Sequence, residues 1–221
     1  MDQREESLGI GLYSVSDAAR LLRTPSATLW RWVRGYVQEL RTGPKQYSPV
    51  LAPKAEPTLS FGDLVELMYV REFRRIGIKL DLIRQVANRY RSEWDVDYPF
   101  ATQRFAVGGR ELLTKENEEW RGALSGQAVL FATLGKQLVH LGDFTSEWRP
   151  LGASHAVLVT PTRAFGKPID DTSGTHTFVL ASAVLAGETP AQVSWFYGTT
   201  ANAVKDAVEF ERGLVGHVSV R

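Results

Sequence analysis

The 221-residue sequence predicts a mainly α-helical fold with small β hairpins, which is an α+β class. Three observations support this prediction. At several places a serine or threonine stands three residues before an acidic or amide side chain, the pattern of a helix N-terminus. Apolar residues then recur at spacings of three and four, as on the buried face of a helix. Between these stretches, segments rich in proline and glycine contain only short alternating runs, which suit hairpins.

Residues 12–36 are expected to fold as two short helices joined by a tight turn. Ser14 and Asp17 mark the start of the first helix, because their side-chain oxygens can accept from backbone N–H groups of its first turn. Thr24 is expected to cap the second helix, with Pro25 in the first helical position, where no partner is needed for its missing N–H. This order of elements predicts a helix-turn-helix.

The second helix separates an apolar face from a polar one. Leu29, Trp32 and Val33 follow the spacing of a buried stripe. The opposite face carries hydroxyl and arginine side chains that suit contact with DNA. They are Ser26, Thr28, Arg31 and Arg34. The local pattern leaves one alternative open, a helical hairpin whose arginines serve only solubility.

The basic residues are concentrated around this motif. Residues 20–91 hold 14 Lys or Arg against 6 Asp or Glu, a balance of +8, whereas residues 92–221 have a balance of −4. Lys and Arg release counterions from phosphates, so this segregation favours a DNA-facing module attached to an acidic remainder. A basic surface that faces acidic protein would give the same balance.

Residues 37–57 are expected to form a wing beside the second helix. Their four prolines exclude a helix, while residues 46–47 and 50–51 suit the strands of a short hairpin. Arg41 and Lys45 would then lie near its tip. A simple linker is the alternative.

Two further helices are expected to complete an N-terminal domain, residues 1–92. Ser60 with Asp63 starts the first of them, which ends at Gly77, and residues 78–90 form the second. Three arginines of the second helix are expected to point outward. They are Arg84, Arg89 and Arg91.

This part of the sequence resembles the winged helix-turn-helix domain of MerR-type regulators. The resemblance rests on Tyr13–Leu22, on Thr28-Leu29 with Trp32, on Arg34–Tyr36 and on Phe73–Arg84. It implies DNA binding. The chain departs from the family pattern at Trp30, where the relatives have a phosphate-binding arginine, and it lacks the long dimerising helix that normally follows. We predict that the residues contacting DNA are Ser26, Thr28, Arg31, Arg34, Tyr36, Arg41 and Lys45.

Residues 93–152 are expected to connect two domains. Residues 104–113 alternate as a β hairpin that turns at Gly108-Gly109, and residues 127–141 show the apolar spacing of one helix. Apolar residues at this spacing favour a core over a ligand pocket.

Residues 153–221 are expected to form a second helix-turn-helix domain. A strand at 156–160 precedes a helix at 177–186, residues 189–192 repeat the start signals of a helix, and residues 200–211 form the last helix. An acidic face on the last helix would repel phosphate, so we expect it to bind protein or to dimerise. Its members are Asn202, Lys205, Asp206, Glu209 and Glu211.

This end of the sequence resembles a small bacterial helix-turn-helix family of formerly unknown function, common in antitoxins of the VapB kind. The resemblance rests on residues 161–169, 187–190 and 197–211. Together with the MerR-like start, residues 98–105 and residues 125–127, the order resembles one full-length antitoxin architecture. The resemblance implies a PIN-domain (VapC-type) ribonuclease toxin as partner. Operator DNA, bound by a homodimer, is the second expected partner.

Enzymatic, metal-binding and membrane-spanning roles find little support in the sequence. It contains no cysteine, and its four histidines lack the short spacings of zinc sites. Neither a nucleophile elbow nor a phosphate loop is present. Asp170-Asp171 could bind a metal, but a solvated loop is the simpler interpretation. No stretch approaches the roughly 18 apolar residues of a membrane span, so we expect a cytoplasmic protein without a cofactor.

We therefore expect the antitoxin of a type II toxin-antitoxin pair, one that neutralises its toxin and binds operator DNA to autoregulate transcription. Two alternatives stay open. One is a one-component MerR-like regulator that senses a small molecule. The other is a helix-turn-helix adaptor that binds protein only.

Overall fold

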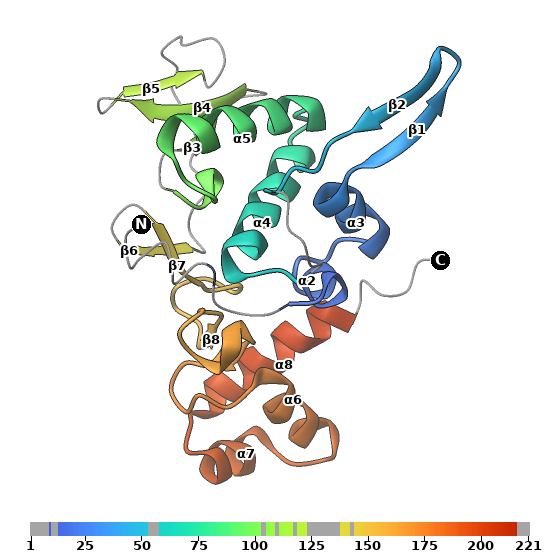
Figure 1. The fold of residues 1–221 in the computed structure, drawn as a ribbon. Helices are drawn as coiled ribbons and strands as arrows, with labels where there is room; N and C mark the ends of the chain where they lie inside the picture. The colour runs from blue at the N-terminus through green and yellow to red at the C-terminus, as the bar shows by residue number, and fades with distance from the viewer. Residues whose placement is uncertain are drawn as a thin grey trace. The chain divides into compact units, whose positions relative to one another are not determined.

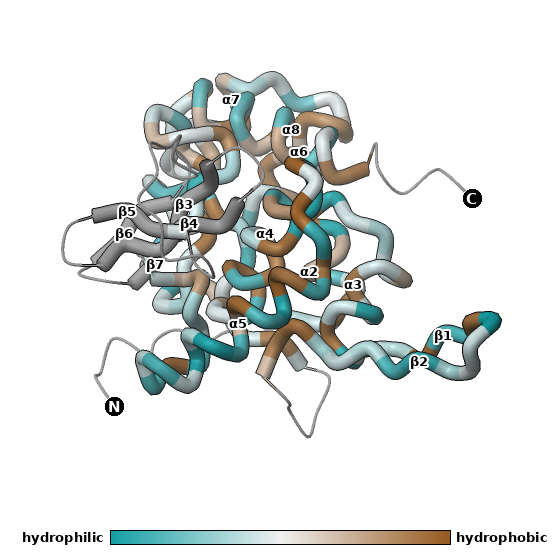
Figure 2. The backbone as a smooth tube through the Cα atoms, turned by 90° about the horizontal axis from the view of Figure 1, so that it is seen from above, coloured by the Kyte–Doolittle hydropathy of each residue, from teal (hydrophilic) through white to brown (hydrophobic). Residues whose placement is uncertain are grey.

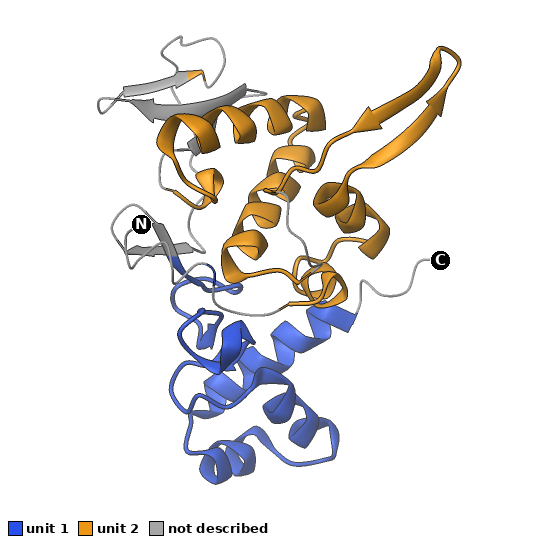
Figure 3. Ribbon diagram, viewed as in Figure 1, with its two compact units in different colours: residues 1–12, 135–221 blue, residues 13–134 orange. Residues whose placement is uncertain are grey.

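The computed structural model confirms the predicted α+β class, because helices dominate and strands pair only in small antiparallel sheets (Figure 1). The chain divides into two compact units, residues 13–134 and residues 1–12 with 135–221 (Figure 3). The domain boundaries expected at 92 and 152 stay predictions. The structure describes residues 9, 13–52, 58–102, 105–108, 111–116, 119–122, 138–141 and 144–215.

Unit 2, residues 13–134, begins with the predicted helix-turn-helix. Helix α2 (Val15–Leu21) starts at a capping box in which Ser14 and Asp17 each accept from the other's backbone N–H, as predicted. Helix α3 (Ser26–Arg34) follows after a short turn. Leu29 and Trp32 are buried on its inner face, which confirms that part of the predicted stripe.

The predicted cap of α3 is wrong. Pro25 occupies the N-cap position, with φ −55° and ψ 133°, and Thr24 lies one residue outside the helix. In the turn after α2, the Thr24 N–H donates to the Ala19 carbonyl at 2.9 Å. Its hydroxyl donates to the Leu22 carbonyl at 3.1 Å. Thr24 therefore completes the end of α2 rather than the start of α3.

A β hairpin follows α3 directly and extends away from it (Figure 1). Strands β1 (Tyr36–Leu40) and β2 (Gly43–Tyr47) pair antiparallel. The hairpin lies in the segment where a wing was predicted, but residues 50–51 belong to neither strand. The Val50 N–H instead donates to the Trp32 carbonyl at 2.8 Å, so this segment packs back onto α3.

Helices α4 (Phe61–Arg75) and α5 (Leu80–Trp94) supply most of the core of unit 2. The predicted capping box at Ser60 and Asp63 is present at the start of α4. Helix α5 runs four residues beyond the predicted end at residue 90 and stops at Asp95, which adopts a left-handed conformation. Fully buried large side chains of this core are Leu29, Phe61, Leu64, Leu67, Phe73, Tyr90 and Phe100.

A 3-10 turn, η1 (Pro99–Ala101), leads into a three-stranded sheet of β3 (Phe105–Gly108), β4 (Glu111–Glu116) and β5 (Glu119–Gly122). The pairing of β3 with β4 confirms the hairpin predicted there.

The helix predicted at residues 127–141 is wrong at its C-terminal end. Residues 127–137 lie outside the described residues, but β6 (Leu138–Leu141) is a strand that pairs with β7 (Phe144–Trp148). The chain turns back after Leu141, so these backbone groups bond across a ladder rather than along a helix.

Unit 1 places short strands before three helices. β8 (Val157–Leu158) pairs with β9 (Ile169–Asp170), and η2 (Ala164–Gly166) lies between them. α6 (Thr177–Leu185), α7 (Pro190–Tyr197) and α8 (Ala201–Val215) then occupy the segments in which the helices of a second helix-turn-helix were predicted. Its buried core is made by Leu180, Val193, Val204 and Ala207.

Candidate DNA-binding surface

A row of contacting aromatic and basic side chains joins α3 to the hairpin. The rings of Tyr36 and Tyr47, directly opposite each other in the ladder, stack with centroids 4.6 Å apart. The guanidinium carbon of Arg31 lies 5.5 Å from the Tyr36 centroid. The Lys45 ammonium lies 4.7 Å from the Tyr47 centroid. These cation–π contacts bring the predicted residues Arg31, Tyr36 and Lys45 into one surface.

A second pair occupies the exposed face of α3. The Arg34 guanidinium carbon lies 5.0 Å from the Trp30 ring centroid, and the Trp30 side chain is 37% exposed. The indole therefore holds Arg34 beside it on the outer face of the helix. Trp30 was not predicted as a contact residue. Its position one residue before Arg31, outside the buried stripe of Leu29 and Trp32, is the sequence signal that could have found it.

The other predicted contact residues lie at the two ends of this surface. Ser26 is exposed in the first turn of α3, and Thr28 is half-buried. Arg41 is exposed in the turn of the hairpin, as predicted. The hairpin consists mostly of hydrophilic residues (Figure 2). Arg31, Arg34, Arg41 and Lys45 are all exposed, and within the described residues none of them forms an ion pair.

Gly35 sets the direction in which the hairpin leaves α3. It ends the helix with φ +72°, and its N–H donates to the Arg31 carbonyl at 3.0 Å. A Cβ at this position would collide with the Tyr47 carbonyl oxygen. Only glycine combines this backbone conformation with so close an approach of β2.

The prediction that Arg84 points outward is wrong. Its side chain is 8% exposed and pairs with Asp81 at 2.8 Å. Its guanidinium carbon lies 5.9 Å from the Tyr36 centroid and 5.5 Å from the Tyr47 centroid. The tyrosine stack of the hairpin therefore covers Arg84 and anchors the hairpin to α5.

Much of the basic charge of residues 20–91 lies within the scaffold. Arg71, for example, donates to the Leu22 carbonyl at 2.7 Å and ties α4 to the turn of the helix-turn-helix. Other arginines pair with acidic side chains of their own helix or bond backbone carbonyls. The arginines held in this way are Arg71, Arg74, Arg75, Arg84, Arg89 and Arg91.

The acidic face predicted on α8 is smaller than expected. Asn202, Lys205 and Glu209 are exposed. Asp206 instead accepts from the Ala156 N–H at 2.9 Å and lies 2.9 Å from Nδ1 of His155, and Glu211 accepts from the Thr177 hydroxyl. These two carboxylates hold α8 against its own unit. The Asp206 carboxylate also raises the pKa of His155.

Asp170-Asp171 is not the solvated loop that the sequence favoured, because both carboxylates are bound by other groups of the protein. Asp170 is buried and accepts from the Ser173 hydroxyl and N–H, and Asp171 lies between Arg149 and Arg163 at 2.7 and 2.9 Å. Hydrogen bonds from Arg149 lower the pKa of Asp171. Across the described ranges, no group of three His, Cys, Asp or Glu side chains could hold a metal ion. None of the helices in those ranges is long and apolar enough to cross a membrane.

Comparison with known protein families identifies a similarity in the same part of the chain. Residues 11–87 match a family model described as "putative DNA-binding HTH domain". The match covers α2, α3, the hairpin, α4 and the first half of α5.

Relatives of similar length are known from Mycobacterium tuberculosis. A protein named "putative antitoxin VapB45" is 26% identical over 90% of this chain and 93% of its own length. The uncharacterised protein Rv2308 is 25% identical over 91% of this chain and 90% of its length. The crystal structure of Rv2018 aligns with a TM-score of 0.63 and 22% identity, over 90% of this chain and 98% of that chain, and so shares its fold. The N-terminal part of the chain is therefore similar to a DNA-binding helix-turn-helix domain, and nearly its whole length aligns with these relatives.

Proposed function

We propose that this protein is an antitoxin that binds operator DNA through α3 and the hairpin and neutralises a PIN-domain ribonuclease toxin. One observation carries the DNA-binding half of the proposal. Four exposed basic side chains, Arg31, Arg34, Arg41 and Lys45, lie along α3 and the adjoining hairpin without an acidic partner among the described residues. Such a surface suits a phosphate backbone.

In the proposed complex α3 enters the major groove, as the second helix of a helix-turn-helix does in other DNA-binding proteins. Arg31 and Arg34 then contact base edges or the adjacent phosphates, and Ser26 and Thr28 donate to a phosphate at the start of α3. The hairpin acts as a wing, with Arg41 and Lys45 on the backbone. Tyr36, which stacks on Tyr47 and contacts the Arg31 guanidinium, contributes mainly by holding Arg31 in place.

The antitoxin half of the proposal is supported by the relative named "putative antitoxin VapB45", which aligns over 90% of this chain. We propose a homodimer, in which two copies of α3 read two half-sites of one operator. The proposal assigns no catalytic role to this chain. The toxin, a VapC-type ribonuclease, would be held by the surface outside α3 and the hairpin.

The DNA-binding surface is tested with the full-length chain and the DNA upstream of its own gene, by fluorescence anisotropy at several salt concentrations. Replacing Arg31 and Arg34 with alanine should weaken operator binding about 10-fold to 100-fold per lost base contact. Arg75→Ala is the matched control, because Arg75 is exposed but pairs with Glu72 on α4. Unchanged affinity of the double variant would refute the assignment of α3.

The toxin-binding half is tested by coexpression with the product of the neighbouring gene, the position in which we expect the toxin. The chain should copurify with the toxin and suppress its growth inhibition. If it does neither, the antitoxin role is wrong, whatever the DNA measurements show.

A further inference from the structure

Helix α7 exposes large aromatic side chains to solvent. Trp195 is 85% exposed and Phe196 is 73% exposed. The core of unit 1 uses Val193 of the same helix and leaves these two rings outside. The Phe196 ring lies edge to face with the Tyr197 ring, with centroids 5.1 Å apart. Neighbouring apolar side chains this exposed mark an interaction surface more often than a solvated one.

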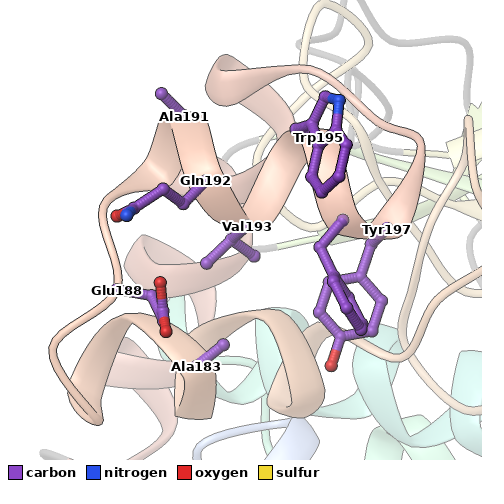
Figure 4. Close-up of a pocket in the computed structure, with 8 residues that line it drawn as sticks. Ala183, Glu188, Ala191, Gln192, Val193, Trp195 and Tyr197 are labelled. Carbon is purple, nitrogen blue, oxygen red and sulfur yellow. The ribbon is translucent and has the colours of Figure 1, made fainter.

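A pocket of about 640 Å³ opens beside these rings, between α6 and α7. In Figure 4, Val193 and Ala183 face each other across it, with Trp195 and Tyr197 along one side and Glu188 along the other. Small-molecule sites bury most of the ligand surface. A wall made of side chains as exposed as Trp195 and Phe196 cannot enclose a small molecule, so the pocket suits a protein surface.

The charge of this region favours a second copy of the chain as the occupant. From residue 175 to residue 204, Glu188 is the single Asp, Glu, Lys or Arg. A highly charged partner would bury its own charges here without a counter-charge, which is costly. A second copy presents the same nearly uncharged face. In a dimer with two-fold symmetry the same surface of both copies forms the interface, so two uncharged faces can pack together.

The exposed area is also of the size that a dimer needs. With about 150 to 250 Å² for a full aromatic side chain, the exposed parts of Trp195 and Phe196 amount to about 240 to 400 Å². A standard interface buries about 800 Å² on each partner. Two residues therefore supply about a third to a half of one side. Leu185, which is 75% exposed at the end of α6, extends the same uncharged segment.

We infer that the α7 face, made by Trp195, Phe196 and the pocket beside them, is the self-association surface of this protein. Two copies pack α7 against α7, and the aromatic side chains of each copy enter the pocket of the other. This inference names the surface through which the proposed homodimer forms. Its biological purpose, bringing two operator-binding surfaces to one operator, rests on the proposed function.

Sedimentation equilibrium of the full-length chain at micromolar concentrations tests the inference. The wild type should be a dimer, and replacing Trp195 and Phe196 with alanine should raise the dimer dissociation constant at least about 100-fold. Trp195→Gln is a second variant. It replaces one ring with a polar side chain and leaves Phe196 in place, so it measures the contribution of Trp195 alone. Phe165→Ala is the matched control, because Phe165 is 76% exposed in η2 and does not line the pocket beside α7. This variant should dimerise as the wild type does. Circular dichroism confirms that each variant is folded.

A monomeric wild type, or a double variant that dimerises unchanged, would overturn the inference. If the wild type is monomeric and the double variant loses toxin capture, the α7 face belongs to the toxin and self-association through it is wrong. If the chain dimerises through α7 but binds neither operator nor toxin, the inference holds and the proposed function fails.

Discussion

Replacing Glu66 with glutamine should remove a pH dependence from the stability of residues 13–134. Glu66 lies on α4 and is fully buried. One carboxyl oxygen accepts from the Ala101 N–H at 3.0 Å, and the other has no hydrogen-bond partner in the described part of the chain. Burial raises the pKa of Glu66 to about 8, although the positive charge of Arg91 opposes the shift.

The sign of the effect follows from proton binding. The folded state holds the Glu66 proton more tightly than the unfolded chain, in which the pKa is near 4.5. The free energy of unfolding therefore falls as the pH rises from about 4.5 to about 8. At about 1.4 kcal/mol per pKa unit, the loss is at most about 5 kcal/mol. That is a large share of the roughly 5 to 15 kcal/mol that stabilise a typical domain.

Urea denaturation between pH 5 and pH 8, followed by circular dichroism, measures this loss. The wild type should become steadily less stable, whereas Glu66→Gln should have a nearly flat profile, because its amide keeps the oxygen that accepts from Ala101 and does not ionise. Glu93→Gln, on the exposed side of α5, is the control and should retain the wild-type slope. A flat wild-type profile would refute the reasoning, and so would a Glu66→Gln variant with the wild-type slope.

Three further substitutions test the contacts of the hairpin in unit 2 and of helix α8 in unit 1. Gly35→Ala should lower the free energy of unfolding by about 1 to 3 kcal/mol in thermal denaturation, because the new Cβ meets the Tyr47 carbonyl at a positive φ. Arg84→Met should speed amide hydrogen exchange in β1 and β2 roughly 10-fold, since the tyrosine stack loses its cation. Asp206→Asn should return the raised pKa of His155 toward its ordinary value in an NMR titration. In the wild type that contact stabilises the protein at low pH and weakens as the pH rises through the pKa of folded His155.

The starts of α2, α4 and α7 could be predicted from the sequence because their causes are local. The capping boxes that begin at Ser14, Ser60 and Thr189 all formed as predicted. Each joins residues three apart, so no other part of the chain is needed to create it. The apolar spacing of α3 was equally informative about Leu29 and Trp32, since helical periodicity decides which side of a helix is buried.

Residues whose environment comes from distant segments were predicted less well. Arg84 lies beside the buried stripe of α5 and was expected in solvent, but the hairpin, about 40 residues earlier in the chain, covers it. Asp206 likewise bonds His155 and Ala156, about 50 residues away. Periodicity along one helix carries no information on what packs over its edge, so both side chains were assigned to the surface.

Contacts formed in the folded chain also change what the charge balance means for DNA binding. The balance of +8 over residues 20–91 suggests many phosphate contacts, but six arginines of α4 and α5 bond carbonyls or side chains within the scaffold. The α3 and hairpin surface has four exposed basic side chains that form no ion pair with the described residues, Arg31, Arg34, Arg41 and Lys45. At about 0.9 per neutralised phosphate, they limit the slope of log affinity against log salt to about −4 per copy and about −7 for a dimer. A steeper slope would mean that basic residues outside this surface also contact the backbone.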